Sequence, residues 1–463
     1  MAYINGNKIA FSSNVNIGGG IEPTGEIEIT ENGTHDVTNY ATAIVNVESS
    51  SGATSGDYYV KVIDYDGTIL KEANLNAGDT FELPTPPSHD GLVFQEWSCS
   101  QDIVDNVITI EDNNVMVGAV YTTASGLSEF DIELTKKTGL DITFNMDGTK
   151  DWGDGTSDDL KTHTYTNYGE YTIKCNGTTM STSSDANLFG SVSNANSFCV
   201  NARLANIAIV GTSAFDGCYS LRTVTMSNSV TTVNERAFSS CQSIIGVVIP
   251  NAVTRIDNYL LIASWSLISI VIPKNITFFG QNAFTNCHSL INVVIPKNIP
   301  GMNNNTFQGC SSLKTIIIPG NVQYTGNYSF QDCHSLTNAT ILNGVKTINQ
   351  YLFKNCYALK NITIPDSVIN IQTYSMNYCY GLKSVSIPKG VETISAYTFQ
   401  WCFGVKTYDF STHTAVPTLS NINAFSGISA IAKIIVPDAL YDEWIVATNW
   451  ATYADYIYKA SEV

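Results

Sequence analysis

Eight cysteines in the second half of the chain stand 23 or 46 residues apart, and thiols at fixed spacing can bind a metal or form disulfides. They are Cys218, Cys241, Cys287, Cys310, Cys333, Cys356, Cys379 and Cys402, and Ser264 fills the position that is skipped. A zinc site needs close pairs such as C-x2-C, which this spacing does not supply. Equivalent side chains of stacked repeats point the same way rather than at each other, and free cysteine is a common small core residue. We therefore expect buried free thiols, with disulfides or a bound metal as the alternative.

The sequence contains no recognisable set of catalytic residues. It contains no G-x-S-x-G, H-E-x-x-H, P-loop or dinucleotide-binding pattern. His288 and His334 each follow one of the periodic cysteines, so they occupy a repeated surface position. Glycoside hydrolysis needs two facing carboxylates, and residues 199–410 contain only seven acids. We expect no enzyme, no catalytic residue and no cofactor.

Two acidic turns resemble calcium loops only superficially. Asp64 and Asp66 lie in a D-G hairpin turn, without the distal bidentate acid of a calcium loop. Four further acids either bind a cation weakly or form a solvated loop, and we favour the loop. They are Asp151, Asp154, Asp158 and Asp159. No metal site is expected.

Aromatic residues recur at fixed distances from the periodic cysteines, and amphipathic rings supply contact area at interfaces. Some stand five residues before the cysteine position: Tyr328, Tyr351, Tyr374 and Tyr397. Others stand next to it: Tyr357, Tyr378, Tyr380, Trp401 and Phe403. These rings either bind a protein or the flat face of a sugar, or they only pack on one another. Their concentration in the last repeats makes this end the predicted contact patch.

A second candidate surface is an apolar column on the outward side of the predicted strands. It consists of Val248, Val271, Val294 and Ile317. An exposed apolar stripe usually marks an interaction surface, so we expect an assembly stripe or a surface that packs on a partner subunit.

All these positions belong to a repeat of 23 residues. An apolar residue such as Phe307 precedes the cysteine position by three residues, a leucine such as Leu313 follows it by three, and a short alternating strand then ends at a proline such as Pro319. One such unit cannot bury its own apolar side, whereas stacked coils build a continuous core. The repeat predicts a solenoid over residues 198–412 with parallel strands about 4.8 Å apart.

The repeat pattern A-F-x-x-C-x-x-L-x-x-V-x-I-P-x-x-V-x-x-I resembles the BspA-type leucine-rich repeat. The stretches "NAFTNCHSLINVVIPKNI" (282–299) and "NTFQGCSSLKTIIIPGNV" (305–322) match it closely. The resemblance implies a curved solenoid that contacts proteins or cell surfaces without catalysis.

Charge is distributed unevenly along the 463 residues. The net charge of −18 combines about −21 in residues 1–198 with about +6 in residues 199–410. The bases of the repeat half look scattered rather than striped, and a phosphate backbone needs clustered Lys and Arg. We expect no nucleic-acid partner. The first residues show no apolar signal segment and no run of 18 apolar residues occurs, so we expect no membrane insertion.

Three further segments resemble known modules. Residues 57–123, with "DYDGT", "AGDTFELPTPP" and "FQEWS", are similar to the β-grasp InlB B-repeat of bacterial surface proteins. The run "DWGDGTSDDLKTHTYTNYGEYTIKCNG" resembles the PKD-like β-sandwich. The segments "MAYINGNKI" and "ENGTHDVTNYATAIVNV" resemble N-terminal parts of phage tail proteins.

The sequence thus predicts a mainly β, multidomain chain: small β-grasp and β-sandwich modules, then a leucine-rich-repeat solenoid with 23-residue coils and a C-terminal cap. The predicted units are a virion-attachment segment (1–50), a β-grasp module (51–123), a PKD-like β-sandwich (124–180), a linker (181–197), the solenoid (198–412) and the cap (413–463).

Our first functional hypothesis is a phage virion protein, a tail fibre, adhesin or head decoration fibre that attaches to the host. It would be assembled in the bacterial cytoplasm, joined to other virion proteins through its N-terminal segment, and would act as a homo-oligomer on a host surface protein or glycan. The alternative is a bacterial cell-surface adhesin of the BspA-like type.

Overall fold

The computed structural model describes residues 2–4, 7–9, 56–135, 140–180, 187–189 and 198–463. Residues 1–54 and 55–463 form two separate units. In the first, β1 (Ala2–Ile4) pairs antiparallel with β2 (Asn7–Ile9). Most of the predicted virion-attachment segment lies outside the described residues.

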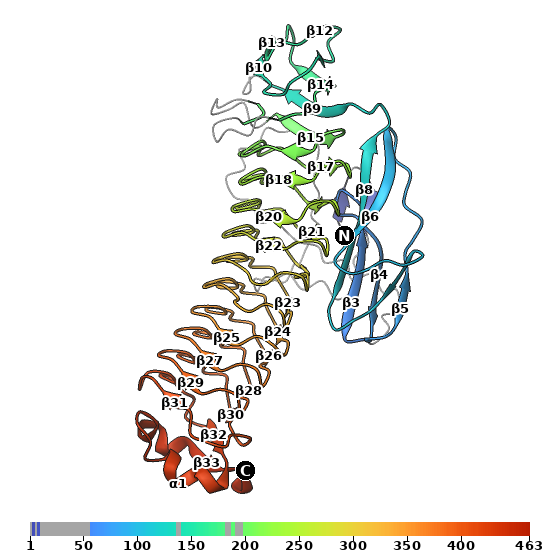
Figure 1. Cartoon of the computed structure of the whole chain (residues 1–463). Helices are drawn as coiled ribbons and strands as arrows, with labels where there is room; N and C mark the ends of the chain where they lie inside the picture. The colour runs from blue at the N-terminus through green and yellow to red at the C-terminus, as the bar shows by residue number, and fades with distance from the viewer. Residues whose placement is uncertain (1, 5–6, 10–55, 136–139, 181–186, 190–197) are drawn as a thin grey trace. The chain divides into compact units, whose positions relative to one another are not determined.

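The second unit is built around a solenoid of stacked coils, as the repeat predicts (Figure 1). Each coil places a short strand beside its equivalent in the next coil, in parallel and 23 residues on, as when Thr315 pairs with Asn338. The strands of this face are β15 (Cys199–Leu204), β17 (Thr223–Met226), β19 (Gly246–Val248), β21 (Ser269–Val271), β23 (Thr315–Ile318), β24 (Asn338–Ile341), β26 (Asn361–Thr363), β28 (Ser384–Ser386), β30 (Thr407–Asp409), β32 (Lys433–Val436) and β33 (Ile457–Lys459).

A second row of two-residue strands lies on another side of the coils. Its members are β16 (Ile209–Val210), β18 (Thr232–Val233), β20 (Arg255–Ile256), β22 (Phe278–Phe279), β25 (Thr347–Ile348), β27 (Asn370–Ile371), β29 (Thr393–Ile394) and β31 (Thr418–Leu419). The predicted apolar columns fill the space between the rows. Phe284, Phe307, Phe330 and Phe353 are fully buried and stack ring on ring, with centroids 5.1–5.7 Å apart.

Residues 128–175 continue the solenoid sheet rather than standing apart from it. Strand β9 (Ser128–Leu134) pairs antiparallel with β15 on one side and with β14 (Gly169–Cys175) on the other. The sheet runs on through β11 (Lys150–Asp151) to β12 (Ser157–Asp158), and β10 (Asp141–Thr143) pairs with β13 (Thr162–Thr164). Phe130 and Trp152 belong to the same apolar core as the coils. This region therefore covers the N-terminal end of the solenoid, although its PKD-like identity stays a prediction.

The C-terminal end is closed by a different structure. It contains a 3-10 turn (η2, Asp438–Leu440), the short helix α1 (Tyr441–Trp444) and two more 3-10 segments, η3 (Trp450–Tyr456) and η4 (Ala460–Glu462). Trp444, Trp450 and Tyr453 are buried against the last coils.

Residues 58–123 form a separate mixed sheet, which we call the docked sheet. Its order is β4 (Ile69–Leu75), β3 (Tyr58–Ile63), β8 (Val115–Thr123) and β6 (Leu92–Cys99), with β3 and β8 parallel. Strands β5 (Thr80–Glu82) and β7 (Val107–Thr109) pair beside it. One face buries its own core around Val60 and Val117. The other face carries Ile63, Met116 and Val120, which pack on the solenoid.

Candidate functional site

A run of exposed aromatic residues lies on one side of the last coils. His334, Tyr357, Tyr380 and Phe403 follow the buried cysteine position by one residue, and we call them the outer aromatic column. Neighbouring rings in this column stack nearly parallel, with centroids 4.8, 5.3 and 5.9 Å apart. Tyr357, Tyr380 and Phe403 keep 40–50% of their surface exposed. Beside them Trp401 stacks on Tyr378 at 6.1 Å.

The other predicted column is better explained by packing. It is the tyrosine column, as we call the set Tyr328, Tyr351, Tyr374 and Tyr397. Neighbouring rings in it stack with centroids 4.5–5.0 Å apart, and all four side chains are half-buried. All four have left-handed backbone, with φ between 57° and 63°. That conformation costs a bulky residue roughly 1–2 kcal/mol, and Asn282 and Asn305 hold the same position in earlier coils. Ring stacking, worth about 0.5–1.5 kcal/mol per pair, offsets this cost.

The stacking corrects one expectation about ligands. Because each ring in a column lies against the next at interplanar angles of 5–12°, the ring faces are occupied by other rings. A sugar therefore finds no free face inside either column. What the columns expose are ring edges and phenol hydroxyls. The edge of an aromatic ring carries positive potential.

Two phenols, one in each column, have raised pKa values and donate hydrogen bonds as neutral groups. Desolvation raises the pKa of Tyr357, with a contribution from nearby Asp332. Desolvation and neighbouring tyrosines likewise raise the pKa of Tyr374. Lys354 adds a positive charge, because its Nζ lies 5.3 Å from the ring centre of Tyr351 and 5.7 Å from that of Tyr374. The patch can thus offer donors and cations, but no acid–base pair.

The predicted assembly stripe is not exposed over most of its length. Val248, Val271 and Val294 are 0–4% exposed, because they lie under Met116 and Val120 of the docked sheet. Ile317, one coil further on, stays half-buried outside that cluster. The expectation of an open apolar stripe was therefore wrong for the three valines, whose cover is part of their own chain.

The docked sheet and the solenoid also approach each other closely at two glycines. A Cβ on Gly246 would lie 2.5 Å from the Cα of Gly67, and one on Gly118 would lie 2.5 Å from a methyl carbon of Val248. Glycine is therefore required at both positions, since real Cβ atoms do not approach so closely. At the position of Gly246 other coils carry larger residues, such as Asn338 and Asn361.

Polar groups at the same contact are paired. The hydroxyl of Ser98 donates to the carbonyl of Ile249 at 2.5 Å, and the amide of Asn113 donates to that of Ile295 at 3.1 Å. Two solenoid lysines form ion pairs with acids of the sheet: Lys274 with Asp102, and Lys297 with Glu111 and Asp112. Opposite charges thus meet at the rim of an apolar contact.

The cysteine column has a structural role. All eleven cysteines are free and buried, including the eight periodic ones for which the sequence predicts free thiols. In seven coils the thiol donates to a backbone carbonyl of the preceding coil, as Cys356 does to Phe330 at 3.1 Å. Ser264 makes the same bond to Phe238. Burial raises the pKa of Cys402 to about 12, so these thiols are protonated and unreactive at neutral pH.

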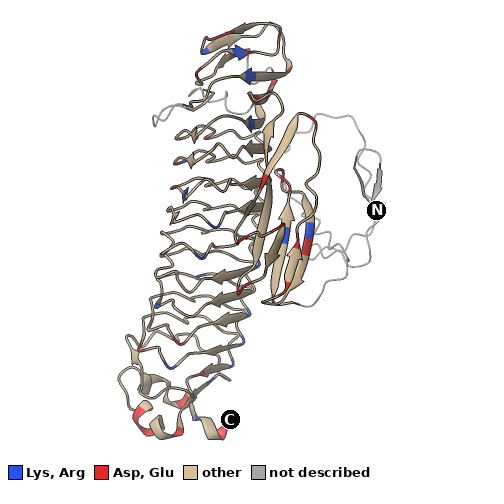
Figure 2. Cartoon of the chain, turned by 45° about the vertical axis from the view of Figure 1, so that its right-hand side comes forward, with Lys and Arg blue, Asp and Glu red and all other residues tan. Residues whose placement is uncertain are grey.

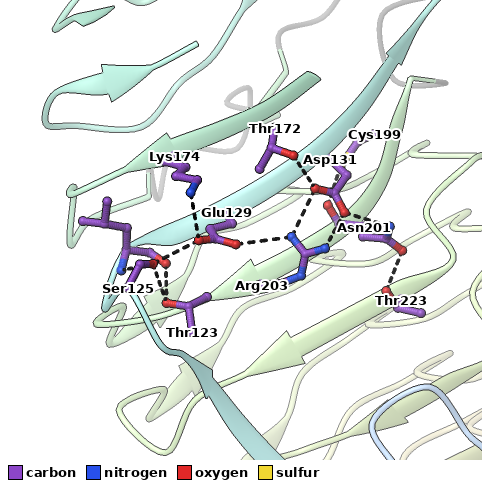
Figure 3. A network of polar contacts seen from close by, with 11 residues as sticks. Thr123, Ser125, Glu129, Asp131, Thr172, Lys174, Cys199, Asn201, Arg203 and Thr223 are labelled. Carbon is purple, nitrogen blue, oxygen red and sulfur yellow. Dashed lines mark hydrogen bonds and ion pairs between the residues drawn. The ribbon is translucent and has the colours of Figure 1, made fainter. Parts of the chain in front are cut away.

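A polar network joins β9 to the first coils (Figure 3). Arg203 pairs with Glu129 at 3.5 Å and with Asp131 at 2.5 Å, and Asn201 and Thr172 also donate to Asp131. Burial opposes ionisation of Asp131, but these hydrogen bonds outweigh it and lower its pKa. The solvent-open hollow beside it, of about 670 Å³, is lined by the acids Glu133, Asp151 and Glu170 and the bases Lys174 and Arg222 besides Asp131. We assign the network to stability.

The structure also reveals an arrangement that the sequence analysis missed. Lys360, Lys383 and Lys406 stand four residues after the cysteine position in three consecutive coils, are exposed, and form what we call the lysine column. The signal was present in the 23-residue spacing, but the bases were counted together rather than by repeat position. Within the described residues, none of the three forms an ion pair.

Comparison with known proteins agrees with this architecture. The model of the BspA-type leucine-rich repeat region matches six copies over residues 182–314 and 325–442, more than half of the chain. The chain belongs to the BspA-type leucine-rich-repeat family. Members of this family are typically cell-surface adhesins and generally non-enzymatic. No curated protein sequence matches significantly.

Several solved structures are similar to parts of this BspA-type protein. A leucine-rich repeat protein of T. pallidum is 28% identical over 33% of this chain and 72% of its own, with a TM-score of 0.32. A leucine rich cell surface protein from Faecalibacterium prausnitzii is 20% identical, covering 51% and 79% (TM-score 0.31). The pneumococcal vaccine antigen PcpA is 14% identical, covering 55% and 76% (TM-score 0.30).

Among the described residues, no three His, Cys, Asp or Glu side chains come together as a group that could hold a metal ion. No helix in the same part of the chain has the length and apolar character needed to cross a membrane.

Proposed function

We propose that this BspA-type protein is a cell-surface adhesin whose binding face lies on the last coils of the solenoid. The observation that carries the proposal is the outer aromatic column, where three exposed rings occur in consecutive coils. Rigid amphipathic rings give contact area at small entropic cost and are enriched in binding sites. Family membership supports the same function.

Earlier coils carry rings at this position only with interruptions. Tyr219 and Trp265 are exposed there, and Trp265 lies 6.4 Å from His288, but Gln242 and Ser311 break the column. Their strand face is partly covered by the docked sheet. The partner we propose is a protein or glycan of another cell surface. The virion hypothesis receives no support from the comparisons, and the segment on which it depended lies mostly outside the described residues. A homo-oligomer remains an untested expectation.

The test is binding of the labelled full chain to bacterial and host cells. In one variant, Tyr357→Ser/Tyr380→Ser/Phe403→Ser, the rings are replaced by the residue that Ser311 supplies in its coil. In the matched control, Tyr351→Asn/Tyr374→Asn/Tyr397→Asn, the tyrosine column receives the residue of Asn282 and Asn305, which suits left-handed backbone. We expect saturable binding that the first variant loses and the control keeps. Equal binding by both variants, or no saturable binding by the native chain, would refute the proposal.

A further inference from the structure

The coil does not require a base at the position of the lysine column. There the other coils carry Ile245, Ile268, Ile291 and Thr337 as well as the isolated bases Arg222 and Lys314. Adjacent coils lie about 4.8 Å apart, and like charges on neighbouring strands repel one another. The backbone shows the adjacency directly, because the amide of Lys406 donates to the carbonyl of Lys383 at 2.8 Å. Three consecutive lysines therefore reduce stability unless an anion binds them.

The column also stands out against its surroundings. Figure 2 shows that the coils carry few charged residues of either sign. Two other solenoid lysines, Lys274 and Lys297, are engaged by acids of the docked sheet. Lys433, which follows the column at its C-terminal end, lies over the ring of Tyr458 at 5.1 Å. Among the coils that the structure describes, the column is where exposed lysines without an ion-pair partner follow one another in consecutive repeats.

The outer aromatic column runs beside the lysines. Tyr357, Tyr380 and Phe403 precede Lys360, Lys383 and Lys406 by three residues in each coil. The rings stack on each other, so they turn their positive edges and, in two of them, a phenol donor toward solvent. Both columns therefore favour negative groups.

The surface between the two columns suits an extended chain. Its residues are Ala358, Gly381 and Gly404, where earlier coils carry serine, as at Ser312 and Ser335. A Cβ on Gly404 would lie 2.2 Å from the carbonyl oxygen of Tyr380, so no side chain fits there. Protein partners usually insert a large residue into a buried pocket. Here the chain instead offers a periodic surface with one positive charge in each coil.

From this arrangement we propose that the last coils bind an acidic polysaccharide, whose carboxylates lie along the lysine column and whose hydroxyls contact the ring edges. The inference rests on the proposed adhesin function and specifies its ligand class. Lysine suits such a polymer, because its ammonium is a mobile point charge that can follow carboxylates of varied geometry. A regular polymer also matches the repeat of the coils better than the irregular surface of a folded protein.

The experiment measures binding of the full chain to immobilised polygalacturonate, with uncharged dextran and poly-L-glutamate as comparisons. The test variant is Lys360→Gln/Lys383→Gln/Lys406→Gln. The control, Lys161→Gln/Lys346→Gln/Lys389→Gln, changes net charge equally at exposed lysines outside the column. Circular dichroism confirms that both variants are folded.

We expect binding to polygalacturonate but not to dextran, about tenfold weaker in the test variant and unchanged in the control, because each exposed charge pair contributes only modestly. Binding should also weaken as salt shortens the screening length from about 10 Å to about 3 Å.

Three outcomes overturn the inference: no binding to polygalacturonate, equal loss in both variants, or equal binding of poly-L-glutamate, which would indicate acidic proteins instead. If the test variant still binds cells normally, the polysaccharide inference fails while the adhesin function stands. If the native chain binds no cell, the proposed function fails as well.

Discussion

The strand face of the solenoid differs between its two halves, although the coils share one repeat. At the outward strand position the coils under the docked sheet carry Val248, Val271 and Val294, which are buried. Later coils carry Thr340, Thr363 and Ser386 at the same position, with no cover. Apolar residues at the outward strand position thus extend along the solenoid about as far as the docked sheet does. The inward positions build the core everywhere, whereas the outward ones depend on what lies against each coil.

The comparison separates two uses of surface in one chain. The covered half is an internal contact with glycine approaches and ion pairs at its rim. The open half carries exposed rings and unpaired lysines. The first surface therefore holds the parts of the chain together, and the second is the one we propose for ligand binding.

The largest expected effect comes from a charge placed in the covered surface. Val271→Asp puts a carboxylate into the apolar cluster that contains Met116 and Val120. We expect a loss of about 3 kcal/mol or more in the free energy of unfolding, or release of the docked sheet. Urea denaturation and limited proteolysis of residues 56–123 measure the two results. Thr363→Asp makes the same change in an open coil and should cost less than about 0.5 kcal/mol. Equal effects would abolish the distinction between the halves.

A smaller loss of stability is expected where the backbone of the solenoid meets that of the docked sheet. Gly246→Asn introduces the residue that Asn338 supplies in an open coil, but its Cβ would overlap Gly67. We expect a cost of about 1–3 kcal/mol from the forced displacement, measured by thermal denaturation. The reverse change, Asn338→Gly, should cost less than about 1 kcal/mol. If Gly246→Asn left the melting temperature unchanged, the turn at Gly67 would not lie against Gly246.

Substitutions in the cysteine column test the buried core, which the covered and the open half of the solenoid share. Cys356→Ser keeps a donor for the carbonyl of Phe330, as Ser264 does for Phe238, so we expect a cost of about 1 kcal/mol. Cys356→Val leaves that carbonyl without its partner and should cost about 2–3 kcal/mol. Chemical denaturation of both variants provides the comparison. If the serine variant is the less stable one, the hydrogen bond is not the reason for the column.

The smallest effect concerns acid stability at the N-terminal end. Because the pKa of Asp131 is lowered in the folded chain, its contribution is present above the usual carboxyl pKa of about 3.9 and is lost as pH falls below it. Asp131→Asn should therefore lower the melting temperature at pH 7 but reduce its dependence on pH in the acid range. Asp57→Asn, at an exposed residue, should leave the profile unchanged. An Asp131→Asn profile parallel to that of the native chain would contradict this assignment.

Much of the fold could be predicted from the sequence, because the apolar columns recur every 23 residues and such a unit is stable only when stacked. The same periodicity predicted the free thiols and the tyrosine column. It could not predict the cover on Val271, because residues 58–123 are distant in the sequence and no repeat relates them to the coils. Nor did the sequence show that ring faces would be occupied, since stacking depends on the rotamer of each tyrosine.

Zero-length carbodiimide cross-linking of the full chain, read by mass spectrometry, tests the central claim most directly. It joins amines to carboxylates only where they touch. We expect links from Lys297 to Glu111 or Asp112 and from Lys274 to Asp102, and none from Lys360, Lys383 or Lys406 to residues 56–123. If the first links are missing while the internal pair Lys61–Glu72 is found, the valines are open to other partners and the division between a covered and a binding half is wrong.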